Sequence, residues 1–148
     1  MTAQQIQPIL KNIETPIGNR VSSHYSAQKV ALLRFIMEEI AVLKEDWDGY
    51  GGLPIEEKVI TNFKFLLNKL PNNLVNSIDT DCILPNSNGT LSIDWSRNSE
   101  GLFLEIGNNY STYYTKHNGQ VDKINDKFTM SNLLELRQFI QDLKSFLT

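Results

Sequence analysis

The chain has 148 residues, of which 41% are hydrophobic, a formal net charge of −3 and one cysteine, Cys82. This length and composition predict one domain over residues 1–148 with a core of its own, and they exclude a disordered chain. The lone cysteine excludes a disulfide scaffold and a zinc ribbon, and the absence of a long basic run argues against sequence-independent nucleic-acid binding.

The first 23 residues carry no signal for a membrane or an export pathway. They lack a basic stretch followed by an apolar one, and no apolar run in the chain reaches the roughly 20 residues that cross a bilayer. We therefore expect a cytoplasmic protein that does not bind membranes. Pro8, Pro16 and Gly18 interrupt the weak apolar pattern, so residues 1–23 are expected to be loosely ordered, with a loop over Thr15–Ser23.

Apolar residues at spacings of three and four predict two helices joined by a glycine-rich loop. The first helix is expected from about Ser26, its N-cap, to Trp47, and the second has Pro54 at its first position and ends at Pro71. The apolar positions expected in the core are Leu33, Ile36, Ile40, Leu43 and Trp47 on the first helix, and Val59, Phe63, Leu66, Leu67 and Leu70 on the second.

From Asp81 to Phe128 the apolar period changes to two, which is typical of strands. The turns contain Asn and Gly and are so short that only antiparallel neighbours can pair, which predicts a meander of four or five strands. A last helix is expected from Ser131, with Leu133, Leu136, Ile140, Leu143 and Leu147 on its apolar stripe. The predicted fold class is α+β, an antiparallel meander covered on one face by the helical hairpin and the C-terminal helix.

The most specific local pattern is Asp-Trp-Asp-Gly-Tyr-Gly-Gly-Leu-Pro over residues 46–54, here called the signature loop. With Leu70–Pro71 and the pattern Leu91-Ser92-Ile93-Asp94-Trp95 after it, the chain resembles a family of small bacterial proteins with a Trp-Asp-Gly-Tyr-Gly signature. The resemblance covers about Leu32 to Ile106. The resemblance implies that a helix, the loop, a second helix and a pair of strands follow one another in this order. It implies no activity, because none is established for the family.

The signature loop has two interpretations. In the first it is only a turn: Gly49 or Gly51 takes a positive φ, Asp48 binds amides at the start of the second helix, and Trp47 packs between the two helices. In the second its aromatic side chains bind a partner. The partner-binding candidates are Trp47, Asp48 and Tyr50 in this loop, and Tyr110, Tyr113 and Tyr114 on a tyrosine-rich strand. For the three strand tyrosines, packing of one or two of the rings in the core is an equal alternative.

A calcium site is an alternative for the same segment. Calcium-binding EF-hand loops place ligands at positions one, three, five and twelve and glycine at six. Counted from Asp46, the matches are Asp48, Gly51 and Glu57. Tyr50 at position five and Pro54 at position nine depart from the pattern, so Asp46, Asp48 and Glu57 remain an alternative metal set.

No catalytic residue or cofactor is predicted. His24 and His117 have no metal-ligand spacing, and Cys82 is typical of a small buried apolar residue. Asp94 and Glu105 are expected on a polar outer sheet face, because a magnesium nuclease site would have a lysine where the chain has Gly107.

The sequence therefore favours a non-enzymatic module that binds another cytosolic protein, such as an antitoxin, immunity or regulatory subunit. The alternatives are the calcium-binding module and a metal-dependent hydrolase whose site shows no recognisable motif.

Overall fold

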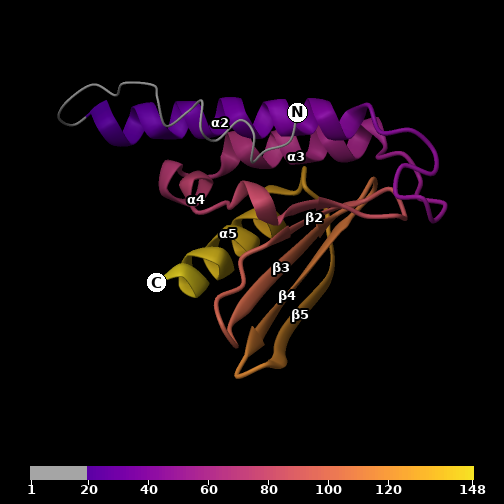
Figure 1. Ribbon diagram of the computed structural model, residues 1–148. Coiled ribbons are helices and arrows are strands. Elements are labelled where there is room, and N and C mark those ends of the chain that lie inside the picture. Colours follow the sequence, from indigo (N-terminus) through magenta and orange to yellow (C-terminus); the bar gives the residue numbers. More distant parts are fainter. Residues whose placement is uncertain (1–19) are drawn as a thin grey trace.

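The computed structural model describes residues 20–148, with side chains from residue 27 onward except that of residue 126. Five antiparallel strands form one sheet in the order β1-β2-β3-β4-β5, so the predicted meander is confirmed. Each strand pairs with the next one along the chain (Figure 1). The strands are β1 (Ile83–Pro85), β2 (Leu91–Asp94), β3 (Gly101–Ile106), β4 (Ser111–His117) and β5 (Gln120–Phe128).

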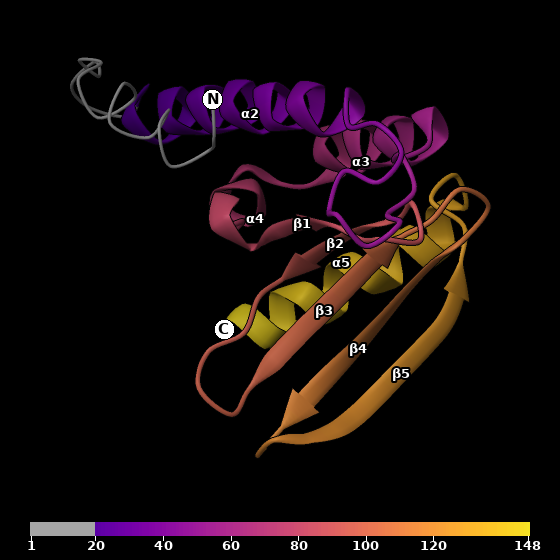
Figure 2. The same cartoon turned by 45° about the vertical axis from the view of Figure 1, so that its right-hand side comes forward.

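The helices lie on one side of the sheet and beyond its β1 edge. The helices are α2 (Arg20–Ala41), α3 (Glu57–Lys69), α4 (Asn72–Asn76), the 3-10 turn η1 (Thr80–Cys82) and α5 (Leu133–Leu147). α2 runs along α3 and α4, and α5 crosses behind the strands (Figure 1 and Figure 2). The sheet face that carries α5 is called the inner face and the opposite one the outer face. The predicted α+β class is therefore confirmed.

The buried apolar residues form one core that all these helices share with the inner face. Alternation along β3 turns Leu102, Leu104 and Ile106 into this core and leaves Phe103 and Glu105 outside. Four aromatic side chains join the sheet to α5 through ring contacts between 5.0 and 6.2 Å from centroid to centroid: Trp95, Tyr113, Phe128 and Phe139.

The boundaries of the first two helices differ from the prediction. α2 already begins at Arg20, so Arg20–Ser23 is helical, Ser26 is not an N-cap, and the rest of the segment expected to be loose lies outside the described residues. α2 ends at Ala41, before Leu43 and Trp47. α3 begins at Glu57, and its N-cap Glu56 has an extended backbone. The Leu53 amide, before this cap, donates to Ser87 O (2.8 Å) outside the helix. Pro54 is therefore not helical.

The last helix begins at Leu133, two residues later than expected, and its buried stripe contains other residues than predicted. Its N-cap is Asn132, whose Oδ1 accepts hydrogen bonds from the amides of Leu134 and Glu135 (3.1 and 3.3 Å). Leu136, Phe139 and Leu143 are the buried residues. Leu133 is exposed and Ile140 is only half-buried, so the stripe is centred on Phe139.

Candidate functional site

The signature loop is held together by its own two aspartates. Asp46 Oδ1 accepts the Gly51 amide (2.7 Å), and Asp48 Oδ1 accepts the amides of Tyr50 and Gly52 (2.9 and 2.8 Å). These amide bonds to Asp48 lower the pKa of its carboxyl group. Asp48 therefore binds amides as expected, but within the loop and not at the start of α3.

Positive φ angles occur where the turn interpretation requires them. Gly49 and Gly51 have φ of 78° and 82°, as predicted, and Asp46 also has a positive φ. Gly52 is required for space, because a Cβ there would lie 2.7 Å from Asp48 Oδ1. The loop is thus a compact turn in which the backbone favours glycine at positions 49 and 51 and the lack of space favours it at position 52.

Trp47 does not pack between the helices, contrary to the prediction. It is half-buried on the loop, and its Nε1 donates to Leu53 O (2.8 Å). Because Leu53 in turn donates to Ser87 O, the indole positions the loop against the turn between β1 and β2. Tyr50 lies near the tip of this loop with 93% of its surface exposed.

The proposed calcium ligands do not converge as an EF-hand requires. One oxygen of Asp46 and one of Asp48 accept backbone amides, while Glu57 lies in the first turn of α3. Among residues 20–148, no group of three or more His, Cys, Asp or Glu side chains could hold a metal ion. The geometry favours a structural role for both aspartates.

The three candidate tyrosines have different environments. Tyr113 points into the core and is 1% exposed, so it cannot contact a partner, contrary to its selection as a binding candidate. Tyr114 points to the outer face and stacks on Phe103, with centroids 4.8 Å apart. Tyr110 precedes β4 and is half exposed, with Lys127 Nζ 5.3 Å from its ring centroid.

The outer face carries an apolar row that no helix of the described chain covers (Figure 2). Register places Phe103 opposite Tyr114, and Tyr114 opposite Ile124 on β5. Ile124 is 62% exposed, and Val121 and Leu84 at either side of this face are 52% and 53% exposed. Asp94 and Glu105 lie on this face, as the alternation predicted. In the strand register Asp94 is opposite Phe103, and Glu105 is opposite Ser92 on one side and Thr112 on the other.

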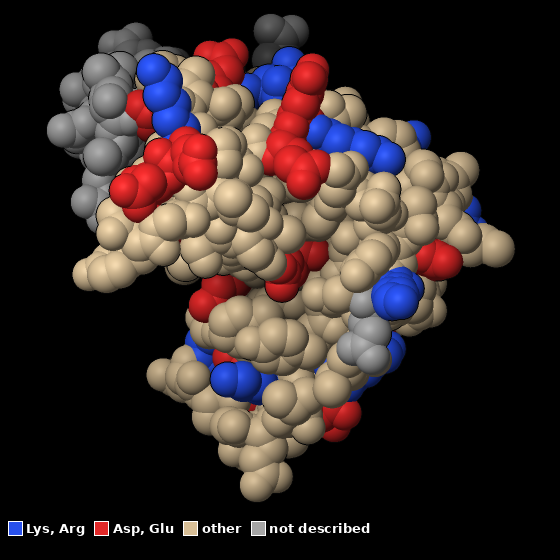
Figure 3. Space-filling model, turned by 90° about the vertical axis from the view of Figure 1, so that its right-hand side faces the viewer, with Lys and Arg blue, Asp and Glu red and all other residues tan. Residues whose placement is uncertain are grey.

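A polar hollow of about 410 Å³ adjoins this row, at the end of the sheet where the signature loop lies. It is lined by Asn88, Thr90, Glu105, residues 107–110 and Thr112. One wall contacts the signature loop, since a Cβ on Gly89 would be 3.1 Å from Pro54 O. In the space-filling view, acidic side chains gather in the indentation between the helical part and the sheet (Figure 3).

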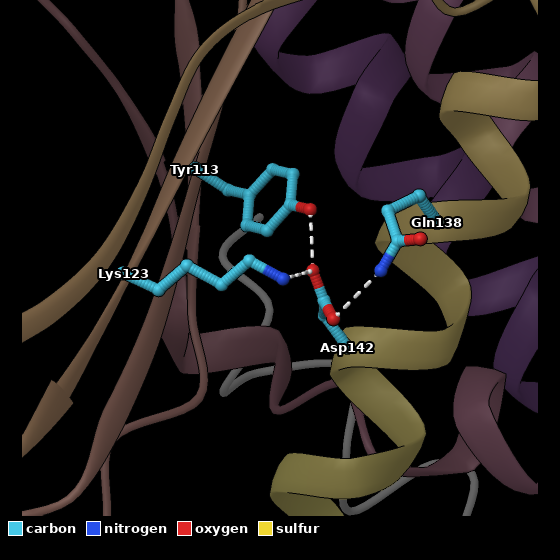
Figure 4. Close-up of polar contacts among 4 residues, drawn as sticks. All are labelled: Tyr113, Lys123, Gln138 and Asp142. Carbon is cyan, nitrogen blue, oxygen red and sulfur yellow. Dashed lines mark hydrogen bonds and ion pairs between the residues drawn. The ribbon is translucent and has the colours of Figure 1, made fainter.

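A second polar cluster joins β4 and β5 to α5 on the inner face (Figure 4). Asp142 Oδ2 accepts hydrogen bonds from the Tyr113 hydroxyl (2.6 Å) and Lys123 Nζ (2.8 Å), and Oδ1 accepts from Gln138 (3.1 Å). Burial raises the pKa of Tyr113, and the bond to Asp142 raises it further. Burial also raises the pKa of Asp142, but the bonds from Lys123 and Tyr113 outweigh burial and lower it overall.

The other titratable candidates show no catalytic arrangement. His117 ends β4 and its Nδ1 lies 2.9 Å from Glu100 Oε2, in an exposed pair. Cys82 is the last residue of η1 and is half-buried, and burial raises the pKa of its thiol, which disfavours a nucleophile. The side chain of His24 lies outside the described residues. None of the described helices is both long and apolar enough to cross a membrane.

Comparison of the chain with protein-family models, with curated proteins and with solved structures gave no match. The resemblance to the signature family therefore stays a prediction. Two features of the site were not anticipated from the sequence. The bond between Tyr113 and Asp142 joins residues 29 positions apart, and the hollow forms where two turns meet the signature loop. Neither arrangement has a local sequence pattern.

Proposed function

We propose that this protein is a non-enzymatic interaction module and that its partner, another protein, docks on the outer face of the sheet. The observation that supports this proposal is the row Phe103, Tyr114 and Ile124, whose side chains are in register on a face that no helix of residues 20–148 covers. Exposed apolar patches bordered by polar residues are typical of protein interfaces. Two aromatic rings in such a row offer large contact areas at little cost in side-chain entropy.

The charges around this row indicate what the partner presents. The chain carries a net charge of −3. On the outer face Asp94 and Glu105 flank the row on β2 and β3, while Lys116 Nζ lies 5.4 Å from the centroid of the Phe103 ring and Lys127 Nζ lies over the Tyr110 ring. The net negative charge of the chain as a whole would attract a partner with a basic surface, and complementary charge raises the rate of association. This is the electrostatic relation between small acidic inhibitors or immunity proteins and basic targets.

The docking proposal predicts a specific loss of binding. Wild-type protein and Ile124→Asp are immobilised and exposed to lysate of the source cells, with Leu134→Asp as the matched control. Leu134 is 76% exposed on α5, away from the outer face, so the control adds the same charge elsewhere. We expect that the wild type and the Leu134→Asp control capture one and the same protein, and that Ile124→Asp does not capture it. The same captured proteins with all three baits would refute the proposal.

A further inference from the structure

The polar hollow beside the outer face has walls that are fixed by hydrogen bonds. Asn62 Nδ2 on α3 donates to Gly107 O and Asn108 O (2.9 and 3.0 Å), and the Asn108 side chain donates to Glu56. Gly107 permits this tight turn, since a Cβ there would lie 2.5 Å from Tyr110 O. The opposite wall is the turn at residues 86–90, which the signature loop holds. A pocket with fixed walls loses little entropy when it binds a ligand.

Glu105 provides the charge of this hollow, because the other lining residues are Asn, Thr, Gly and Tyr. Its Oε1 accepts the Thr90 hydroxyl (2.7 Å) and Asn88 Nδ2 (3.3 Å). The hydrogen bonds of the described side chains use only this oxygen and leave Oε2 free. The carboxylate is therefore held in place with one oxygen available to a donor.

An aromatic ring that already attracts a cation completes the hollow. Tyr110 lines it, and Lys127 Nζ lies 5.3 Å from the centroid of the Tyr110 ring. A carboxylate beside a cation-binding ring is the arrangement that receives a guanidinium group, which is planar, donates several hydrogen bonds and stacks on aromatic faces.

We propose that the hollow binds the guanidinium group of an arginine side chain of the partner that docks on the outer face. This inference rests on the proposed function, whose partner it describes more closely. Glu105 Oε2 accepts from the guanidinium, and the Tyr110 ring stacks on it after Lys127 moves aside. The apolar row then contacts residues next to that arginine. The signature loop acts as the support of one wall and not as a ligand.

The direct test uses N-acetyl-L-arginine methylamide as a probe and follows backbone amide shifts by NMR. We expect saturable shifts at Asn88, Glu105 and Asn109. N-acetyl-L-citrulline methylamide has a similar shape without the charge, and the corresponding lysine derivative has a charge without the planar group. Both are expected to bind at least about tenfold more weakly, since a charged hydrogen bond or its geometry is lost.

Three variants distinguish binding of the probe in the hollow from a general attraction of any cation to an acidic protein. Glu105→Gln keeps an acceptor for Thr90 but removes the charge, and should weaken binding at least about tenfold. Asp94→Asn is the matched control, because it removes a carboxylate from the same face but outside the hollow. Among the described residues this carboxylate accepts a hydrogen bond from Ser96 (2.5 Å). It should change affinity less than about twofold. Lys127→Gln removes the competing cation and should strengthen binding.

Shifts that are unchanged by Glu105→Gln, equal for citrulline or lysine, or absent altogether would overturn the arginine site. The arginine site and the docking of a partner on the outer face can fail independently, and the two failures give different results. If the arginine probe binds as expected but Ile124→Asp captures the same proteins as the wild type, the hollow is supported and the apolar row is not the interface. If Ile124→Asp loses the partner but the probe does not bind, the outer face is the interface without an arginine anchor.

Discussion

The Tyr113 hydroxyl donates a 2.6 Å hydrogen bond to Asp142 Oδ2 and so joins β4 to α5 across the inner face. Lys123 on β5 reaches the same oxygen (2.8 Å). A tyrosine that sequence reasoning placed on a binding surface is thus part of the core. Its hydroxyl group is buried next to a carboxylate that a lysine neutralises, so the pair stabilises the contact between helix and sheet.

Tyr113→Phe should lower the free energy of unfolding by about 1–3 kcal/mol, because it leaves a partly buried carboxylate without one of its donors. Urea denaturation followed by fluorescence measures this change. Tyr114→Phe is the matched control, since Tyr114 lies on the outer face and none of the hydrogen bonds of the described residues involves its hydroxyl. Equal losses for the two variants would contradict the assigned role of the Tyr113 hydroxyl.

The raised pKa of Tyr113 predicts a loss of stability in alkali. A group whose pKa is raised on folding stabilises the protein fully below its unfolded pKa of about 10, and this contribution is lost as pH rises through the folded pKa. The wild type should therefore lose more stability above about pH 10 than Tyr113→Phe does. Parallel curves of unfolding free energy against pH would show that Tyr113 is not responsible.

The lowered pKa of Asp142 makes the opposite prediction in acid. A carboxyl group whose pKa is lowered on folding stabilises the protein above its unfolded pKa of about 4, and this contribution is lost as pH falls through the folded pKa. Asp142→Asn should be less stable than the wild type at neutral pH and should lose less stability on acidification. Thermal melts between about pH 2 and 7 measure the difference, and identical acid profiles would count against the assignment.

Gly52→Ala should destabilise the protein more than Gly49→Ala. At Gly52 a Cβ would lie 2.7 Å from Asp48 Oδ1 and 2.9 Å from Trp47 Nε1, so both groups that hold the signature loop must move. At Gly49 nothing lies within 4 Å of the added Cβ, and the cost is the positive φ alone, about 1 kcal/mol. Chemical denaturation of both variants gives the order, and the reverse order would be inconsistent with this packing.

Calcium should leave the melting temperature unchanged, because Asp46 and Asp48 already accept the loop amides. The measurement is a thermal melt with excess calcium and with chelator, for the wild type and for Glu57→Ala. A rise in melting temperature that Glu57→Ala abolishes would restore the calcium module, since a ligand that binds only the folded state stabilises it.

The fold could be predicted from the sequence where periodicity is regular, and the site could be predicted only in part. Alternation along Gly101–Ile106 correctly turned Glu105 outward, and short turns required an antiparallel meander. One error occurs beside a distant contact: Leu53 bonds to Ser87, and α3 begins beyond Pro54, at Glu57. Tyr113 lies in the core because alternation along β4 turns it to the face opposite Tyr114. Its hydrogen bond to Asp142 joins it to the last helix, and no local pattern shows that contact.

A photo-crosslinking amino acid on the outer face shows directly whether a protein docks there. We would replace Ile124 with p-benzoylphenylalanine in one variant and Leu134 in another, and irradiate the source cells. We expect one discrete crosslinked product from position 124, which disappears on competition with unlabelled wild-type protein but not with Ile124→Asp. The same products from both positions, or none from position 124, would contradict docking on the outer face.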